Sequence, residues 1–189
     1  CPAGLALNSN AQGRYGESGP LLKRSLAIYE KALGPDHPNV ALSLNNIAEN
    51  YRAQGRYAEA EPLYKRSLAI YEKALGPEHP DVALSLNNIA LNYNAQGRYG
   101  ESEPLLKRSL AIYEKALGPD HPNVALSLHN IAENYRAQGR YAEAEPVSNS
   151  SLATHAQTPG PVQPASAPSR PKHSLKSNTH RPQRSAGRA

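Results

Sequence analysis

Hydrophobic and polar residues follow a helical spacing over most of the chain, in two alternating kinds of segment. In the first kind, apolar residues recur at the i, i+3, i+4 and i+7 positions that place them on one face of an α-helix. They are Val40, Leu44, Ile47, Ala48 and Tyr51. Pro38 suits the first turn of this helix, because its missing N–H needs no partner there. Gly55 ends the helix, because glycine tolerates left-handed backbone angles.

The second kind of segment begins after Gly55 and Arg56 and runs to the pair Gly76-Pro77, which terminates it. Its apolar residues are Tyr57, Ala60, Tyr64, Leu68, Tyr71 and Leu75. Neither helix can bury its apolar face alone, so neighbouring helix pairs must stack to complete the core. The pattern therefore predicts an all-α solenoid of antiparallel helix pairs.

These helix pairs form a repeating unit of 42 residues. The segment that begins SLNNIAENYRAQGRYAEAEP at Ser43 returns from Ser85 and, in part, from Ser127. Residues 13–54 and 97–138 are also identical except at two positions, which indicates duplication of an 84-residue pair of units. The two differences are Gly19 against Glu103 and Asn45 against His129. We expect every unit to have a similar structural role.

The repeats divide the chain into an array over residues 1–156 and a tail over residues 157–189. The array comprises a partial repeat 1–37, repeats 38–79 and 80–121, and a degenerate last repeat 122–156. Residues 5–18 match residues 89–102 at all but two positions, so we interpret the chain as a fragment that starts inside the first helix of a unit. Beyond Pro146 the repeat pattern is lost, and we expect the second helix of the last unit to degenerate there.

Residues 5 to about 156 resemble the tetratricopeptide repeat in the spacing of Leu44, Ile47, Ala48, Tyr51, Gly55, Tyr57, Ala60 and Tyr64. Leu44 stands where Trp is common in that family, and Ala48 where Gly is common. The longer unit, with its LNNIA, Glu-Ala-Glu-Pro, Lys-Arg-Ser-Leu and Leu-Gly-Pro-Asp-His-Pro segments, is similar to the kinesin light chain type of repeat. The resemblance implies a right-handed superhelical solenoid whose first helices line a concave groove. It also implies a scaffold or adaptor that binds an extended peptide or protein segment in that groove, often as one segment of a larger protein.

Candidate contacts in the groove are the first-helix residues that packing does not use. In the first complete unit these are Asn45, Asn46, Glu49 and Arg52; in the second Asn87, Asn88, Leu91 and Asn94; in the third His129, Asn130, Glu133 and Arg136. An Asn side chain both donates and accepts, so a row of them suits the backbone of an extended peptide. The resemblance to kinesin light chains implies the same role for Asn45, Asn46, Asn87, Asn88 and Asn130.

Three alternatives for these candidates stay open. Asn46, Asn88 and Asn130 are also suited to tying adjacent helices together. Glu49 and Arg52 either grip a partner or pair with each other, as residues one helical turn apart do. Leu91, which replaces Glu49 in the second unit, is either an apolar anchor for a partner or a neutral change.

The sequence carries no recognisable catalytic or cofactor site. His37, His79 and His121 are one repeat apart, a separation of at least about 8–10 Å between packed helices, so they do not share a zinc ion and are interpreted as helix-entry residues. Ser25, Ser67 and Ser109 occupy positions where small side chains pack. A phosphate loop and a Cys pair are both absent from the sequence. We expect no enzyme activity, no cofactor and no metal.

Composition and charge separate the array from the tail. The net charge of +5 arises in residues 157–189, which hold six Lys and Arg and no acidic residue, whereas residues 1–156 hold 15 Lys and Arg against 16 Asp and Glu. The Pro-, Ser- and Arg-rich tail is expected to be disordered. The alternative function is nonspecific binding of nucleic acid or an anionic surface by this tail, and an abrupt change of composition also fits a shifted reading frame or a fusion.

The cysteine content and the hydropathy of the chain bear on its compartment. Cys1 is the single cysteine, so the repeats must be stable without an intramolecular disulfide, as in a reducing compartment. No segment has the roughly 20 consecutive apolar residues that span a bilayer. We expect a cytoplasmic protein with a protein or peptide partner, no specific nucleic acid and no membrane.

Overall fold

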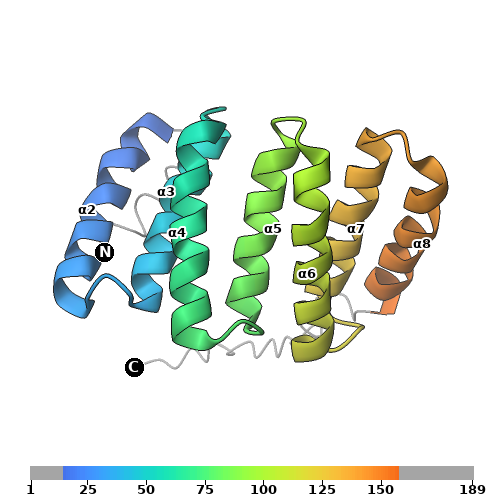
Figure 1. Cartoon of the computed structure of the whole chain (residues 1–189). Coiled ribbons are helices and arrows are strands. Elements are labelled where there is room, and N and C mark those ends of the chain that lie inside the picture. The colour runs from blue at the N-terminus through green and yellow to red at the C-terminus, as the bar shows by residue number, and fades with distance from the viewer. Residues whose placement is uncertain (1–14, 158–189) are drawn as a thin grey trace, which may run out of the picture. The chain divides into compact units, whose positions relative to one another are not determined.

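The structure, a computed structural model, describes residues 15–157, and this part of the chain consists of seven α-helices without a strand (Figure 1). The helices are α2 (Tyr15–Leu33), α3 (Pro38–Ala53), α4 (Tyr57–Leu75), α5 (Pro80–Asn94), α6 (Tyr99–Leu117), α7 (Pro122–Ala137) and α8 (Tyr141–Gln157). The predicted all-α solenoid is confirmed. The helix bounds near Pro38, Gly55 and Gly76 also agree with the sequence pattern.

Each unit is a pair of antiparallel helices that packs onto the next pair. We name α3, α5 and α7 the A helices and α2, α4, α6 and α8 the B helices. Each A helix packs against the B helix that follows it, and the units join where α2 meets α3, α4 meets α5 and α6 meets α7. Figure 1 shows the helix pairs following one another from α2 to α8, with α3 behind α4 and α7 behind α6 in this view.

The ends of the helices have local causes. His37 precedes α3 in extended backbone conformation, and its Nδ1 accepts the N–H of Asn39 at 3.1 Å, which caps the helix. His79 and His121 cap α5 and α7 in the same way, so their interpretation as helix-entry residues is confirmed. Gly55 follows α3 with φ of 73°, a left-handed conformation that a side chain would strain.

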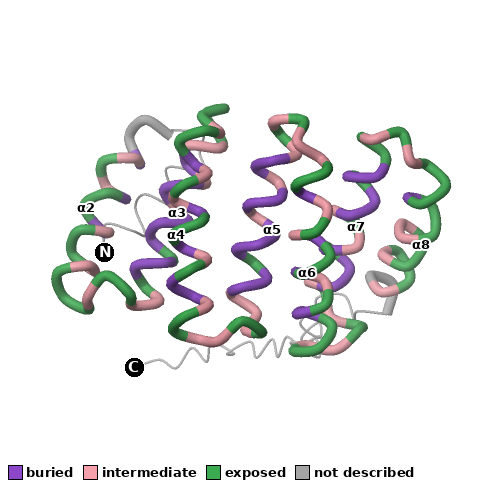
Figure 2. The backbone as a smooth tube through the Cα atoms, viewed as in Figure 1, coloured by how far each residue is buried: buried purple, intermediate pink, exposed green. Residues whose placement is uncertain are grey.

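The apolar faces of the units form a core of several buried clusters along the array. Figure 2 shows buried backbone running along the inner faces of α3, α5 and α7. The largest buried cluster contains Val40, Ala41, Leu44, Ile70, Tyr71, Val82, Ala83, Leu86, Ile112, Tyr113 and Val124. Burial raises the pKa of both Tyr71 and Tyr113 to about 12. This cluster runs from α3 to α7, and Leu26 and Tyr29 of α2 pack against it, so the array is held together mainly by apolar burial.

Serines on the B helices form hydrogen bonds to the A helix of the same unit. The Oγ of Ser67 donates to the carbonyl oxygen of Ala41 at 2.8 Å, and Ser109 and Ser151 make the equivalent bonds. Ser67 and Ser109 are fully buried. The predicted packing role of these serines is confirmed, and each hydroxyl satisfies a helix carbonyl.

The last B helix differs from the prediction. We expected it to degenerate after Pro146, but α8 is helical to Gln157. Ala144 is buried in a cluster with Ile131 and Tyr135 of α7, and Ser151 keeps its bond to Ala125, so these contacts maintain the register of α8. The changed sequence instead leaves side chains in solvent, with Leu152 67% exposed.

The units are further joined by two carboxylate clusters near the start of the B helices. The first comprises Glu61, Lys65, Tyr93 and Arg98. Glu61 Oε1 accepts hydrogen bonds from Lys65 Nζ at 2.6 Å and Tyr93 Oη at 3.1 Å, and its Oε2 accepts one from Arg98 at 2.8 Å. Partial burial raises the pKa of Glu61, but the bonds from Lys65, Arg98 and Tyr93 outweigh it and lower the pKa to about 2.

The second carboxylate cluster repeats the first in the next interface. Glu103 accepts from Lys107 at 2.7 Å, Tyr135 at 3.4 Å and Arg140 at 2.6 Å. The bond from Arg140, opposed by burial and reinforced by Lys107, lowers the pKa of Glu103 to about 2. Each cluster joins two consecutive units, because the carboxylate and the lysine come from one unit and the tyrosine and arginine from the next.

Some expectations lie outside the described residues. These are the part of the first repeat within residues 1–14, including Cys1, and the tail beyond Gln157. The fragment interpretation, the disordered tail and its alternative function stay predictions.

Candidate functional site

The A helices place their candidate residues on one common face, which we call the A-helix face. Asn88 Nδ2 donates to Asn45 Oδ1 at 3.0 Å, and Asn130 Nδ2 donates to Asn87 Oδ1 at 2.8 Å. These amide pairs link α3 to α5 and α5 to α7, 43 residues apart in sequence. Asn45 and Asn87 are largely buried by the contact, with 8% and 7% of their surface exposed.

The amide pairs bear on the alternative that some asparagines tie helices together. Asn88 and Asn130 do bridge adjacent A helices, and their acceptors are Asn45 and Asn87, which were also candidates for partner contact. Each pair uses one donor and one acceptor. Among the described residues, Asn45 Nδ2 and Asn88 Oδ1 form no hydrogen bond, so the pair keeps an N–H₂ donor and a C=O acceptor for a partner.

Glu49 and Arg52 pair with each other at the C-terminal end of α3. Arg52 donates to Glu49 at 2.7 Å, and the hydroxyl of Tyr64 donates to the same carboxylate. About a third of each charged side chain is exposed. Burial and the neighbouring Glu49 raise the pKa of Tyr64, so this tyrosine stays protonated and acts as a donor. Arg52 is therefore neutralised within its own unit.

The third unit arranges the same positions differently. Arg136 pairs with Glu133 and also donates to Ser148 Oγ at 2.6 Å. Ser148 takes the repeat position of Tyr64, whose hydroxyl binds Glu49 in the first complete unit. This pair is more exposed than Glu49 and Arg52, at 43% and 51%.

The middle unit has apolar residues at these positions. Leu91 replaces Glu49, and the position of Tyr64 is taken by Leu106, which is fully buried. Leu91 itself is half-buried. Asn94, also a candidate contact, accepts a hydrogen bond from Asn134 at 2.8 Å. In the first complete unit, Glu49 accepts a hydrogen bond from the Tyr64 hydroxyl. The middle unit lacks both groups, since Leu91 and Leu106 take their positions.

Three exposed leucines on the A-helix face were missed by the sequence reasoning. Leu42, Leu84 and Leu126 occupy the same repeat position and are 48%, 43% and 54% exposed. The sequence did contain a signal. Each leucine lies two residues after a buried valine, off the i, i+3, i+4 pattern of the core, yet it recurs in every unit. An apolar residue repeated outside the buried pattern indicates a surface that contacts something else.

Clefts lie beside these leucines. Leu84, Asn87 and Leu126 line a cleft of about 310 Å³ between α5 and α7. Leu126 and His129 line a second cleft, of about 330 Å³, with Leu152 of α8. The A-helix face therefore offers apolar hollows next to polar amide groups. This combination is suited to binding a polypeptide, whose backbone is polar and whose side chains include apolar groups.

Over residues 15–157, no three His, Cys, Asp or Glu side chains are grouped so as to hold a metal ion. Within the same range, none of the helices has the length and apolar character that crossing a membrane would need.

Comparison with known proteins gives a family and similar structures. The family model described as tetratricopeptide repeat matches residues 2–73, 43–115 and 81–157. The chain is similar to a crystal structure of nearly identical TPR-like repeats from Podosopora anserina, assigned to a kinesin light chain, with 33% identity and a TM-score of 0.73. The match covers 84% of this chain and 75% of that one.

A second solved structure shares the fold at lower identity. It is BtubC (BKLC) from P. vanneervenii, with 21% identity and a TM-score of 0.75 over 88% of this chain and 68% of that one. Among curated protein sequences, none matches the chain.

Proposed function

The chain belongs to the tetratricopeptide repeat family, with repeats of the kinesin light chain type, and from that premise we propose that it is a scaffold that binds an extended polypeptide on the A-helix face. Proteins of this family generally mediate protein–protein interactions. In this proposal the A-helix face is the concave groove of the solenoid. The role is non-catalytic, the compartment is the cytoplasm, and the partner is a protein segment.

The observation that carries the proposal is the row of amide pairs flanked by exposed leucines. Asn45 and Asn88 present one donor and one acceptor to a partner where α3 meets α5. Asn87 and Asn130 present the same two groups where α5 meets α7. An extended backbone presents N–H and C=O groups that need such partners regardless of its sequence. Side chains of the partner then occupy the clefts beside Leu84 and Leu126.

The charged candidates contribute less in this proposal. Glu49 already binds Arg52 and Tyr64, so a partner must displace internal bonds to use them. We therefore assign the selectivity of the face chiefly to apolar side chains of the partner. Arg136 and Glu133, which are more exposed, are secondary contacts.

A peptide selection tests the proposal. Peptides selected from a random display library on the wild-type array are titrated against Leu84→Arg, which places a charge in the cleft. Loss of one buried leucine contact of about 1.5–3 kcal/mol corresponds to affinity weaker by roughly 10- to 100-fold.

The matched control is Ile28→Arg, the same change at a similarly exposed apolar residue on B helix α2. This control should bind the selected peptides within about 2-fold of the wild type, since surface changes away from the contact have small effects. Equal affinity of Leu84→Arg and Ile28→Arg for all selected peptides would remove the A-helix face as the binding surface.

A further inference from the structure

The interface between α2 and α3 has the donors of a carboxylate cluster without the carboxylate. The residue 42 positions before Glu61 is Gly19, whereas the lysine, tyrosine and arginine of the cluster are retained as Lys23, Tyr51 and Arg56. Three groups that converge on a glutamate in both later interfaces thus surround a glycine in this one.

The arginine keeps its place without the glutamate. Arg56 Cζ lies 4.3 Å from the centre of the Tyr51 ring, compared with 4.0 Å for Arg98 over Tyr93. The cation–π contact therefore holds the guanidinium in position in both interfaces.

The lysine is also in its usual place. Lys23 Nζ lies 5.7 Å from the centre of the Tyr51 ring, and Lys65 Nζ lies 5.9 Å from that of Tyr93. Lys65 donates to Glu61, but Lys23 has no carboxylate at the equivalent position. The three donors at the first interface are therefore already arranged as they are where a carboxylate is present.

The hydrogen bonds of the arginines show which donor lacks an acceptor. Arg98 donates to Glu101 through Nε and one terminal nitrogen, and to Glu61 through the other. Arg56 makes the first two bonds to Glu59. Within residues 15–157, its remaining terminal nitrogen has no acceptor. The Arg56 side chain is correspondingly more exposed, at 44% compared with 31% for Arg98.

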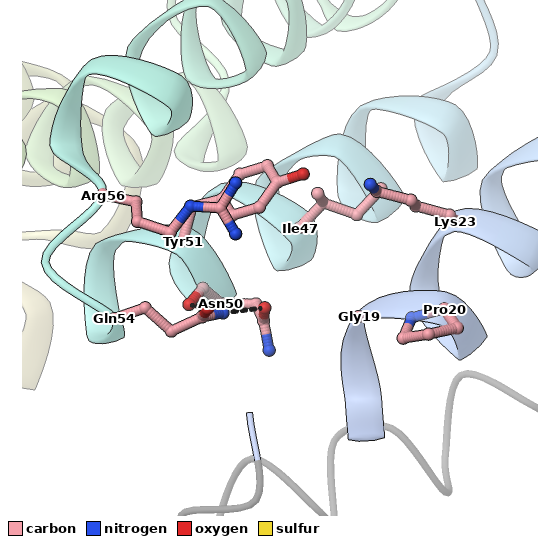
Figure 3. Close-up of a pocket in the computed structure, with 8 residues that line it drawn as sticks. All are labelled: Gly19, Pro20, Lys23, Ile47, Asn50, Tyr51, Gln54 and Arg56. Carbon is pink, nitrogen blue, oxygen red and sulfur yellow. Dashed lines mark hydrogen bonds between the residues drawn. The ribbon is translucent and has the colours of Figure 1, made fainter. Parts of the chain in front are cut away.

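Space is available where the carboxylate would be. Figure 3 shows Tyr51 and Arg56 on one side of a cleft, with Gly19 and Lys23 of α2 on the other. The cleft measures about 310 Å³. Among residues 15–157, a Cβ added to Gly19 would meet only Asn50 Oδ1, at the ordinary contact distance of 3.8 Å.

We propose that this cleft is a binding site for a carboxylate group, which takes the place of the missing glutamate between Lys23, Tyr51 and Arg56. The group comes from a glutamate side chain of a bound polypeptide or from a small organic acid. At the next interface the equivalent donors Lys65, Tyr93 and Arg98 lower the pKa of Glu61 to about 2, in keeping with a site that favours an ionised carboxylate. The site is separate from the A-helix face, so it does not depend on the groove proposal.

Titration with defined carboxylates tests the site. The probes are sodium glutarate and the peptide acetyl-Ala-Glu-Ala-amide, with the Gln peptide as a neutral match. The readout is the ¹⁵N–¹H NMR signals of Gly19, Tyr51 and the Arg56 Nε. We expect saturable shifts with Kd on the order of 1 mM, since a largely solvent-exposed ion pair is weak. A wild-type chain without saturable shifts, or equal binding of the Glu and Gln peptides, overturns the proposal.

Two variants at Gly19 separate the site from nonspecific binding. Gly19→Glu supplies the carboxylate from the chain itself and should weaken binding of either probe by about 10-fold or more. Gly19→Ala leaves the cleft open and should bind as the wild type does. Unchanged binding by Gly19→Glu contradicts the proposal. Tighter binding of the peptide than of glutarate identifies a polypeptide source, and tighter binding of glutarate identifies a small acid.

A stability comparison provides a second readout that needs no ligand. Gly19→Glu should melt about 2–4 °C above Gly19→Gln, which has the same size but no charge, if the added carboxylate contributes about 1 kcal/mol. Equal melting temperatures mean that the three donors do not receive a carboxylate, and the site is then rejected.

Discussion

The interface between α2 and α3 and the interface between α4 and α5 share the lysine, tyrosine and arginine of a carboxylate cluster, but only the second has the glutamate. In the second, Glu61 joins Lys65, Tyr93 and Arg98 across the boundary between units. In the first, Gly19 takes the place of the glutamate and a cleft remains. Apolar residues are buried at both boundaries, with Leu22 and Ile47 at the first and Tyr64 and Ile89 at the second.

This difference shows which interactions the array requires. The first interface is assembled without its carboxylate, because Leu22 of α2 is buried against Ile47 of α3, and Leu26 of α2 packs against the largest cluster. Apolar burial therefore provides most of the free energy that holds the units together. The carboxylate clusters at the edge of each interface contribute less. A position that contributes little to stacking can change in one unit, and here the change creates a cleft.

The largest effect is expected from substitutions that test whether equivalent buried leucines stabilise the two interfaces equally. Leu44→Ala and Leu86→Ala remove equivalent, fully buried side chains, and each should lower the free energy of unfolding by about 2–5 kcal/mol. Denaturant unfolding followed by circular dichroism measures both. Leu84→Ala, at an exposed position of α5, should change it by less than about 0.5 kcal/mol. A much smaller loss for Leu44→Ala than for Leu86→Ala would show that the first interface is packed differently.

The next prediction concerns a substitution that removes the carboxylate from the second interface and so makes it more like the first. Glu61→Gln should lower stability at neutral pH by about 1 kcal/mol, because three donors lose a charged acceptor. The pKa of Glu61 falls from its usual 4.5 to about 2 in the folded chain. Its contribution is therefore present above pH 4.5 and is lost as the pH falls toward 2. The variant should show a smaller loss of stability over this range.

The control for this pH dependence is Glu145→Gln. Glu145 has the same repeat position as Glu61, but among the described residues it forms no ion pair. Wild type and Glu145→Gln should lose stability in parallel between pH 4.5 and 2. If Glu61→Gln also follows them, the carboxylate cluster does not stabilise the second interface.

The smallest effect concerns the ion pairs at the other end of the B helices. Lys73 pairs with Asp36, and the two side chains are 70% and 58% exposed. Lys73→Ala should change the free energy of unfolding by less than about 0.5 kcal/mol, because water and salt screen exposed pairs. Denaturant unfolding at low and high salt measures this. A loss above about 1 kcal/mol would mean that exposed pairs contribute as much to stacking as the carboxylate clusters.

The folded units followed directly from the sequence, whereas several site contacts did not. The spacing of Val40, Leu44 and Ile47 predicted α3, and Gly55 predicted its end, because both depend on residues within a few positions of each other. The degeneration predicted for α8 was wrong. Its altered pattern changed the exposure of Leu152, while contacts of Ala144 and Ser151 with α7 kept it helical.

The roles of the candidate residues depended on contacts between units. Asn45 is a candidate surface residue by its spacing in α3, but Asn88 of α5 covers it and donates to it. The exposed position of Leu84 could have been inferred from its place off the buried pattern. The pairing of Glu49 with Tyr64 could not, because it joins two helices whose relative rotation depends on packing.

By itself, the sequence determined the repeat length, the helix pairs and the all-α solenoid, since these follow from periodic apolar positions and from turn residues close in the chain. It also contained the difference between Gly19 and Glu103. Only the tertiary structure decided what that difference means. Lys23 lies on α2, and Tyr51 and Arg56 belong to the next unit, so these donors meet around the position of Gly19 only when the units stack. Stacking places residues about 30 or more positions apart within a few ångströms, and no local pattern encodes such a contact.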